Sequence, residues 1–234
     1  MVIPAKKEKA EKVYLMVHKN ITEENYSIHR KYYTEIQKKL NAAKIETELV
    51  YCDWQNIEEI TRVARDLILK EADSEIAINL ASGSKNHAIG LDRACMTVRK
   101  RENIHPFYPE AKKWNAGKYP HQQSEGVKRI KQVPIHRIIV PEPELIEALK
   151  IIKRDAVDIP TRKGRKGVKK KDLAKALYGD SSKVNLTKLQ RNITQKLEKT
   201  WRAIEIIQVG QSDWISLNRE GRYLRYVLKE EETY

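Results

Sequence analysis

The feature that most constrains the fold is an alternation of short β-type runs with longer helical periods. The strand-like runs are residues 12–18, 45–51, 75–80 and 104–108, and the helical periods between them are residues 25–43, 56–70 and 86–100. Helices that alternate with strands are typical of βα units, whose crossover connections build a mostly parallel sheet. We therefore expect an α/β domain in this part of the chain.

The remainder of the chain follows a different order. Residues 109–134 form a polar stretch with no sustained period, and residues 135–140 predict a final strand. After them come a helix, a basic loop at 161–171, a short helix at 168–177, a longer helix at 186–199, and two strands at 203–209 and 214–217. This order predicts a helix-turn-helix followed by a β-hairpin wing. We place the domain boundary near Val140, with an α/β domain at 1–140 and a winged helix-turn-helix domain at 141–234.

Positive charge is concentrated in the second domain. The chain has a formal net charge of +14, and residues 162–225 contain 17 Lys and Arg against 6 Asp and Glu. A polyanion is the natural partner, with nucleic acid ahead of an anionic membrane surface. Because no apolar run is long enough to span a bilayer and the first residues lack a secretory signal, we expect a cytoplasmic protein.

The helix at 186–199 is the candidate recognition helix, because Arg and Gln side chains can reach base edges in a major groove. We expect its solvent face to carry Thr187, Lys188, Gln190, Arg191, Thr194 and Gln195. The basic residues expected to meet phosphates of double-stranded DNA are Arg162, Lys163, Arg165, Lys166, Lys169, Lys170 and Lys171. The alternative is that these charges only solvate a dimerisation or linker domain.

A turn with anion-binding chemistry follows the third strand. Asn79 and Leu80 end the strand, Ala81 to Ser84 form a glycine-containing turn, and Lys85 opens the next helix. Backbone N–H groups and the positive end of a helix favour a phosphate at such a place. The pattern is neither a Walker A sequence nor a GxGxxG turn, so a simple helix cap is the alternative.

Residues 79–96, NLASGSKNHAIGLDRACM, lie between the DWQNIEEITRVARDLI helix and the HPFYPE strand and resemble a CARF (CRISPR-associated Rossmann fold) domain. The chain as a whole, including its LEKTWRAIEIIQVGQSDWISLNREGRYL segment, is similar to CARF-like winged-helix transcriptional regulators found mainly in archaea. The resemblance implies a Rossmann-like first domain, a homodimer and a link to CRISPR-based antiviral defence.

The resemblance also implies an effector, a cyclic oligoadenylate acting as a nucleotide second messenger. The residues that would contact its phosphate and ribose are Asn79, Ser82, Gly83, Ser84 and Lys85. Such families begin with a further strand and a glycine-bearing loop ahead of the segment matching Lys12 to His18, and the sequence starts too late to contain them. We expect either a misassigned start codon or a short domain.

Two other functions stay open. Some CARF proteins cleave their cyclic ligand, so a ring nuclease is one alternative, although the sequence places no general base beside Ser84 and Lys85 and we assign no catalytic residue. A protein-interaction module with a basic docking face is the other. Cys52 and Cys95 are expected to be reduced core residues, and the six histidines lack metal-ligand spacing, so we expect neither a metal nor another cofactor.

Overall fold

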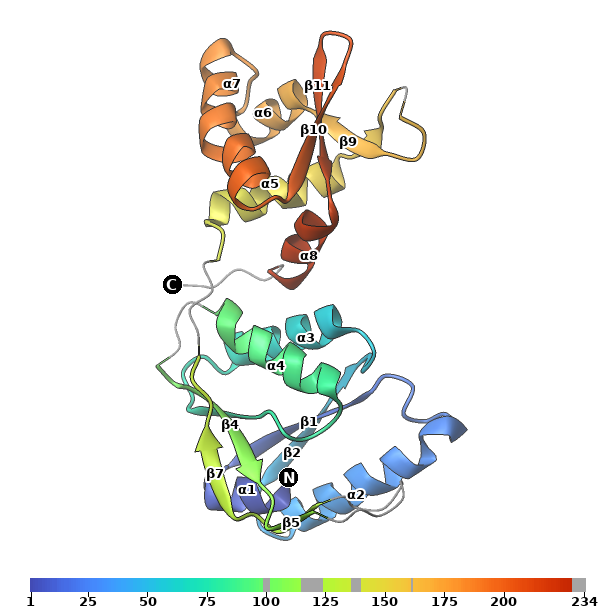
Figure 1. Ribbon diagram of the computed structural model, residues 1–234, viewed down its shortest axis with the longest axis vertical. Coiled ribbons are helices and arrows are strands. Elements are labelled where there is room, and N and C mark those ends of the chain that lie inside the picture. Colours follow the sequence, from blue (N-terminus) through green and yellow to red (C-terminus); the bar gives the residue numbers. More distant parts are fainter. Residues whose placement is uncertain (99–101, 115–123, 136–139, 161, 229–234) are drawn as a thin grey trace. The chain divides into compact units, whose positions relative to one another are not determined.

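The computed structural model describes residues 1–98, 102–114, 124–135, 140–160 and 162–228. The chain divides into two compact units, Met1–Ile138 and Ile139–Tyr234 (Figure 1). The functional roles that we expect for 1–140 and 141–234 stay predictions. No described helix is long and apolar enough to cross a membrane.

The first unit is an α/β structure with parallel and mixed strand pairing. Its helices are α1 (Val2–Lys7), α2 (Ser27–Asn41), α3 (Ile57–Lys70) and α4 (Lys85–Thr97), with a 3-10 turn η1 (Glu24–Tyr26). Its strands are β1 (Lys12–His18), β2 (Glu46–Cys52), β3 (Ile76–Asn79), β4 (Ile104–Glu110), β5 (Lys113–Trp114), β6 (Ser124–Glu125) and β7 (Arg129–Gln132). Strand β1 pairs with β2 in parallel, whereas β4 lies between a parallel β3 and an antiparallel β7. The strand expected at 135–140 falls mostly outside the described residues.

Helices α3 and α4 pack on each other and bury one apolar cluster. The cluster includes Ala64 and Ile68 from α3, Ala94 and Cys95 from α4, and Ile104 from β4. Cys52 and Cys95 are both buried free thiols. The two helices approach closely at Gly90, where an added Cβ would lie 2.5 Å from Cγ2 and 2.8 Å from Cβ of the buried Ile60. The start of α4 at Lys85, beside the glycine-containing turn, is set by a capping box between Ser84 and His87.

The second unit combines helices with one antiparallel sheet. Its helical segments are α5 (Pro143–Arg154), α6 (Lys170–Tyr178), α7 (Lys183–Leu189), the π-helical turns η2 (Gln190–Thr194) and η3 (Lys196–Thr200), and α8 (Arg219–Val227). Its strands are β8 (Val157–Asp158), β9 (Lys166–Lys169), β10 (Ile204–Val209) and β11 (Ser212–Leu217). The sheet order is β10-β11-β9-β8, with every neighbouring pair antiparallel.

Strand β9 corrects two expectations. The sequence pattern predicts a basic loop that includes Lys166 to Lys169 and a helix start at Val168, but this segment pairs with β11, and α6 begins at Lys170. The reason is close packing: a Cβ on Gly167 would lie 2.7 Å from the Ile215 carbonyl oxygen. Glycine is the residue that admits this approach of two backbones.

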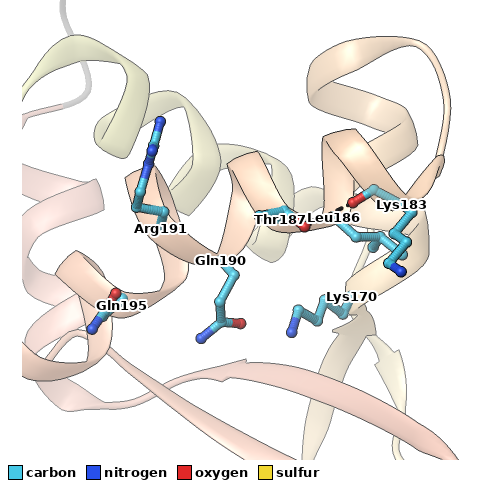
Figure 2. A pocket seen from close by; sticks show the side chains of 7 residues that line it. All are labelled: Lys170, Lys183, Leu186, Thr187, Gln190, Arg191 and Gln195. Atoms are coloured by element: carbon cyan, nitrogen blue, oxygen red, sulfur yellow. Dashed lines mark hydrogen bonds between the residues drawn. The ribbon is translucent and has the colours of Figure 1, made fainter.

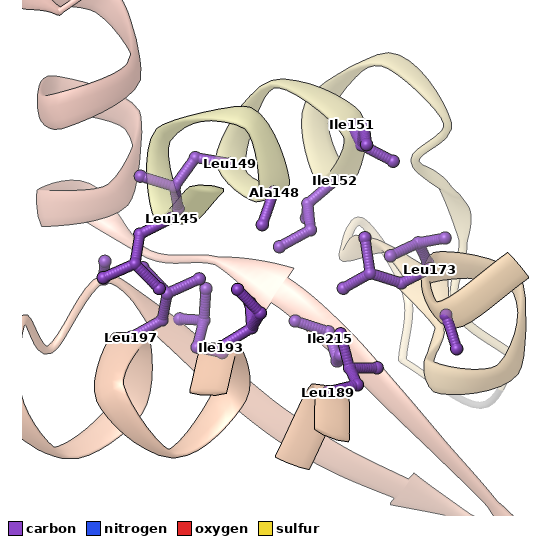
Figure 3. Packing of buried hydrophobic residues seen from close by; sticks show 14 residues of the cluster. Leu145, Ala148, Leu149, Ile151, Ile152, Leu173, Leu189, Ile193, Leu197 and Ile215 are labelled. Atoms are coloured by element: carbon purple, nitrogen blue, oxygen red, sulfur yellow. The ribbon is translucent and has the colours of Figure 1, made fainter. Parts of the chain in front are cut away.

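One apolar core holds the second unit together. Leu145, Leu149 and Ile152 on α5 share one cluster with Leu173 of α6, and a row from the α7 to η3 segment completes it with Ile215 (Figure 3). Local signals set the helix ends. Pro143 opens α5, Gly179 ends α6 with φ +88°, and the Ser182 side chain accepts a hydrogen bond from the Asn185 N–H at the start of α7.

We predict that Gly90→Ala destabilises the first unit. The Cβ contacts with Ile60 involve an atom fixed to its backbone, so overpacking should cost about 1–3 kcal/mol, and the higher helix propensity of alanine returns about 1 kcal/mol. A lower midpoint of urea unfolding, followed by circular dichroism, is expected. The exposed Arg93→Ala on the same helix serves as control, and equal midpoints for the two variants would contradict the packing argument.

Candidate functional site

An open groove of about 350 Å³ lies on the second unit, beside α6 and along α7 and η2 (Figure 2). The residues that line it are Lys170, Lys183, Leu186, Thr187, Gln190, Arg191 and Gln195. Three of these side chains are cationic and none is acidic, so the lining has a positive potential. Figure 2 shows the Gln190 amide and the Lys170 amino group extending into the same space.

Lys170 connects the groove to the sheet. Its Nζ lies 3.5 Å from Oδ2 of Asp213, which comes from β11. Both side chains are partly exposed, and an ion pair of this kind contributes only about 0–1 kcal/mol to stability. An anionic ligand in the groove can therefore compete for Lys170 at small cost.

The structure gathers only some of the residues expected to bind DNA. Those that line the groove are Lys170, Thr187, Gln190, Arg191 and Gln195, and the sequence interpretation missed Lys183 and Leu186. The signal for Lys183 is its position directly after the Ser182 cap, which places it at the start of α7. The sequence pattern instead predicts a turn over 179–185.

The other residues expected to bind DNA lie outside the groove lining. On the recognition-helix face, the Lys188 Nζ is 4.3 Å from the centre of the Tyr178 ring, and among the expected phosphate contacts, the Lys169 Nζ is 5.4 Å from the Trp214 ring. Arg165 forms an ion pair of 2.5 Å with Glu205. The remaining residues of the expected set are all exposed and comprise Arg162, Lys163, Lys166 and Lys171.

Thr194 departs from the expected solvent face, because its side chain is 0% exposed. The apolar residues Leu189, Ile193 and Leu197 of the same helix are also fully buried. The π turns η2 and η3 cover residues 190–194 and 196–200, so the winding here departs from that of a regular α-helix. Thr194 lies on the buried face, whereas Gln190 and Gln195 line the groove.

Val184 is a second residue that the sequence interpretation missed. It is 76% exposed, although it is apolar and lies at the start of α7, next to Lys183. A lone exposed valine is common on protein surfaces. Beside this groove it adds an apolar contact to that of the half-buried Leu186.

The glycine-containing turn of the first unit is held by its own hydrogen bonds. The Asn79 Nδ2 donates to Ser82 Oγ over 2.8 Å, and the Asn79 Oδ1 accepts from the Ala81 N–H. Gly83 has φ +102°, and a Cβ there would lie 2.9 Å from the His87 ring. Ser82 is half-buried, whereas Gly83, Ser84 and Lys85 are exposed. The turn thus offers its exposed backbone and the Lys85 amino group to solvent.

Five aromatic rings gather beside this turn, a cluster that the sequence interpretation did not anticipate. The Trp54 ring makes edge contacts with Tyr26 and with three histidines, His18, His29 and His87, at centroid distances of 5.0–6.2 Å. The Trp54 Nε1 is buried and has no hydrogen-bond partner among the described residues. The rings come from four separate segments, so only the tertiary fold brings them together. Among the described residues, no group of three His, Cys, Asp or Glu side chains could hold a metal ion.

Comparison with known proteins matches only the first unit. Residues 1–114 match the family model described as "HFX_2341_N:-like, N-terminal". No curated protein matches the chain. The match covers residues from α1 through β5 and includes the glycine-containing turn.

We predict that protonation of His87 destabilises the first unit. Burial lowers the pKa of His87, and its Nδ1 lies 3.2 Å from the Ser84 N–H and 3.0 Å from Ser84 Oγ. The unfolded chain binds a proton near pH 6.5 while the folded chain resists it, so this stability is present above pH 6.5 and is lost as the pH falls below it.

His87→Gln tests this prediction, because glutamine at this position can still reach back to the backbone N–H of Ser84 without titrating. The free energy of unfolding of the wild type should fall more steeply below about pH 6.5 than that of the variant. Other titrating groups are common to both proteins and cancel in the difference. Parallel curves would show that His87 carries no such proton linkage.

Proposed function

We propose that this chain is a ligand-responsive, DNA-binding transcriptional regulator whose residues 141–234 act as a winged helix-turn-helix domain. The order of elements supports this proposal: α5, β9, α6, the helix from α7 to η3, and then the hairpin β10-β11. Strand β9 pairs with β11, so the hairpin is anchored to the segment directly ahead of the two helices. Such an arrangement offers one helix to a major groove and a wing beside it.

The observation that carries the proposal is the composition of the groove on α7 and η2. Lys170, Lys183 and Arg191 supply charge for phosphates, while Gln190 and Gln195 supply amides able to hydrogen bond with base edges. Double-stranded DNA is a polyanion whose base edges such amides can recognise. The wing tip, Gly210 to Ser212, is uncharged, so we assign the phosphate contacts to the helices.

Two features of the helix from α7 to η3 favour DNA binding over a dimerisation or linker role. The apolar side chains of this helix are already buried in the core, since Leu189, Ile193 and Leu197 are each 0% exposed. What the helix presents outward is polar and cationic, with Val184 as the apolar exception. Double-stranded DNA fits that exception too, because an apolar side chain can contact a thymine methyl group.

The effector site of the proposed regulator is the turn from Asn79 to Lys85. An N-terminal helix end, exposed backbone around Gly83 and the Lys85 amino group together favour a phosphate. A cyclic oligoadenylate is the proposed effector, and a homodimer, with one turn in each copy, is the proposed assembly. A Rossmann-like arrangement of the first unit belongs to the same proposal.

We predict that Lys170→Ala with Lys183→Ala weakens DNA binding. Binding of a labelled random-sequence duplex should be measured by fluorescence anisotropy between about 50 and 200 mM salt. The slope of log affinity against log salt should become shallower by about 0.9 for each phosphate that the variant no longer neutralises.

The matched control removes two exposed lysines from the first unit, Lys31→Ala with Lys38→Ala. It lowers the net charge equally without touching the groove, so its slope should stay near that of the wild type. A wild-type affinity that does not depend on salt would reject the DNA-binding proposal. Equal decreases of affinity in the two double variants would reject the groove as its site.

We predict that Lys85→Ala weakens binding of cyclic tetra-adenylate, measured by isothermal titration calorimetry. The amino group supplies the only full positive charge of the turn 79–85, so its removal should lower affinity by about tenfold, the effect of one charge-assisted hydrogen bond. Lys39→Ala on α2 is the exposed control. Unchanged affinity in Lys85→Ala would reject this turn as the site, and linear product formed in a Lys85-dependent manner would favour the ring nuclease.

A further inference from the structure

The buried Thr194 hydroxyl lies within hydrogen-bond distance of two oxygen atoms of Gln190. Its Oγ1 is 3.3 Å from the Gln190 backbone oxygen and 3.2 Å from the side-chain Oε1. Because Thr194 is 0% exposed, solvent does not satisfy this hydroxyl. A buried hydroxyl must donate its hydrogen to protein, and both acceptors within reach belong to Gln190.

The Gln190 side-chain oxygen competes well for that hydrogen. The Gln190 backbone oxygen already accepts the Gln195 N–H across the π turn η2. When Oε1 accepts from Thr194, the amide can no longer exchange its oxygen and nitrogen by rotation without losing a bond. Figure 2 shows the whole amide extending from the helix into the groove, with its oxygen on the side of Lys170 and its nitrogen on the other side.

An amide held in this way matches one base better than the others. A glutamine reads adenine by accepting from the N6 amino group and donating to N7. The held Oε1 keeps a second lone pair and the Nε2 keeps its two hydrogens, so both bonds remain available. Guanine presents two acceptors to the same edge, which a single fixed amide cannot pair in the same geometry.

We propose that Thr194 is a positioning residue whose hydroxyl fixes the Gln190 amide for bidentate reading of one adenine in the major groove. This inference rests on the proposed DNA-binding function. Thr194 itself does not touch DNA, because the core encloses it. Gln195 has the same side chain in the same groove but lies exposed, and it therefore provides an internal comparison.

The test is selection of bound sequences from a random duplex pool with the full chain, for the wild type and four variants. Thr194→Val removes the hydroxyl while nearly keeping the side-chain volume, and Thr194→Ser keeps the hydroxyl. Gln190→Ala and Gln195→Ala remove the two amides. Thermal unfolding of each variant reports any purely structural effect of the substitution.

We expect the wild type to prefer adenine at one position of its motif. Thr194→Val and Gln190→Ala should lose that preference at the same position, by about 5- to 100-fold, the range of one bidentate pair. Thr194→Ser should retain it, whereas Gln195→Ala should change the base preference at a different position of the motif. A structural role alone would lower the unfolding temperature of Thr194→Val and leave its base preference intact.

Three outcomes overturn the inference. These are an unchanged adenine preference in Thr194→Val, a change at a different position from that of Gln190→Ala, and salt-dependent binding of the wild type that selects no motif. The last outcome leaves the DNA-binding function standing. Wild-type binding that is independent of salt rejects the function itself, so the two failures are distinguishable.

Discussion

Burial of one apolar row on residues 183–200 is the interaction on which the second unit depends. Leu189, Ile193 and Leu197 pack against α5 and Ile215, and full burial of each such side chain is worth about 1.5–3 kcal/mol. The segment that carries them is wound as two π turns, and all three side chains lie in the core. Burial of this row leaves the polar side chains of the opposite face to line the groove.

The electrostatics of the groove follow from which polar and charged side chains line it. Its cations come from α6, α7 and η2. The carboxylate near Lys170, that of Asp213, forms a partly exposed pair that stabilises the fold little. Because this ion pairing is weak, the positive potential of the groove remains available to a polyanion. Salt should screen the attraction between the two. Affinity would come from charge, whereas base preference would come from the two amides.

The sequence predicted elements set by local pattern and failed where distant chain segments meet. The bounds of β1 follow from its own alternation and agree with the structure. Strand β9 could not be inferred from its basic residues, because Gly167 is explained only by Ile215 approaching from β11. Thr194 was misplaced because a regular α-helix was assumed. The spacing of 189, 193 and 197 is equally typical of a regular amphipathic α-helix, so it carried no signal for the π turns.

His87 contacts both the glycine-containing turn and the aromatic cluster around Trp54. The cluster forms only when separate segments of the first unit come together. Its ring caps α4 through Ser84 and also contacts Trp54, the centre of the aromatic cluster. The cluster includes His18 at the end of β1 and Trp54 just after the end of β2, so ring contacts link the turn to the ends of two strands. A ligand that displaced Ser84 from Nδ1 would leave that nitrogen unpaired in a buried place, which costs free energy unless the ring moves. Movement of the ring would alter its packing on Trp54, and this gives the turn a physical route to the strand ends behind it.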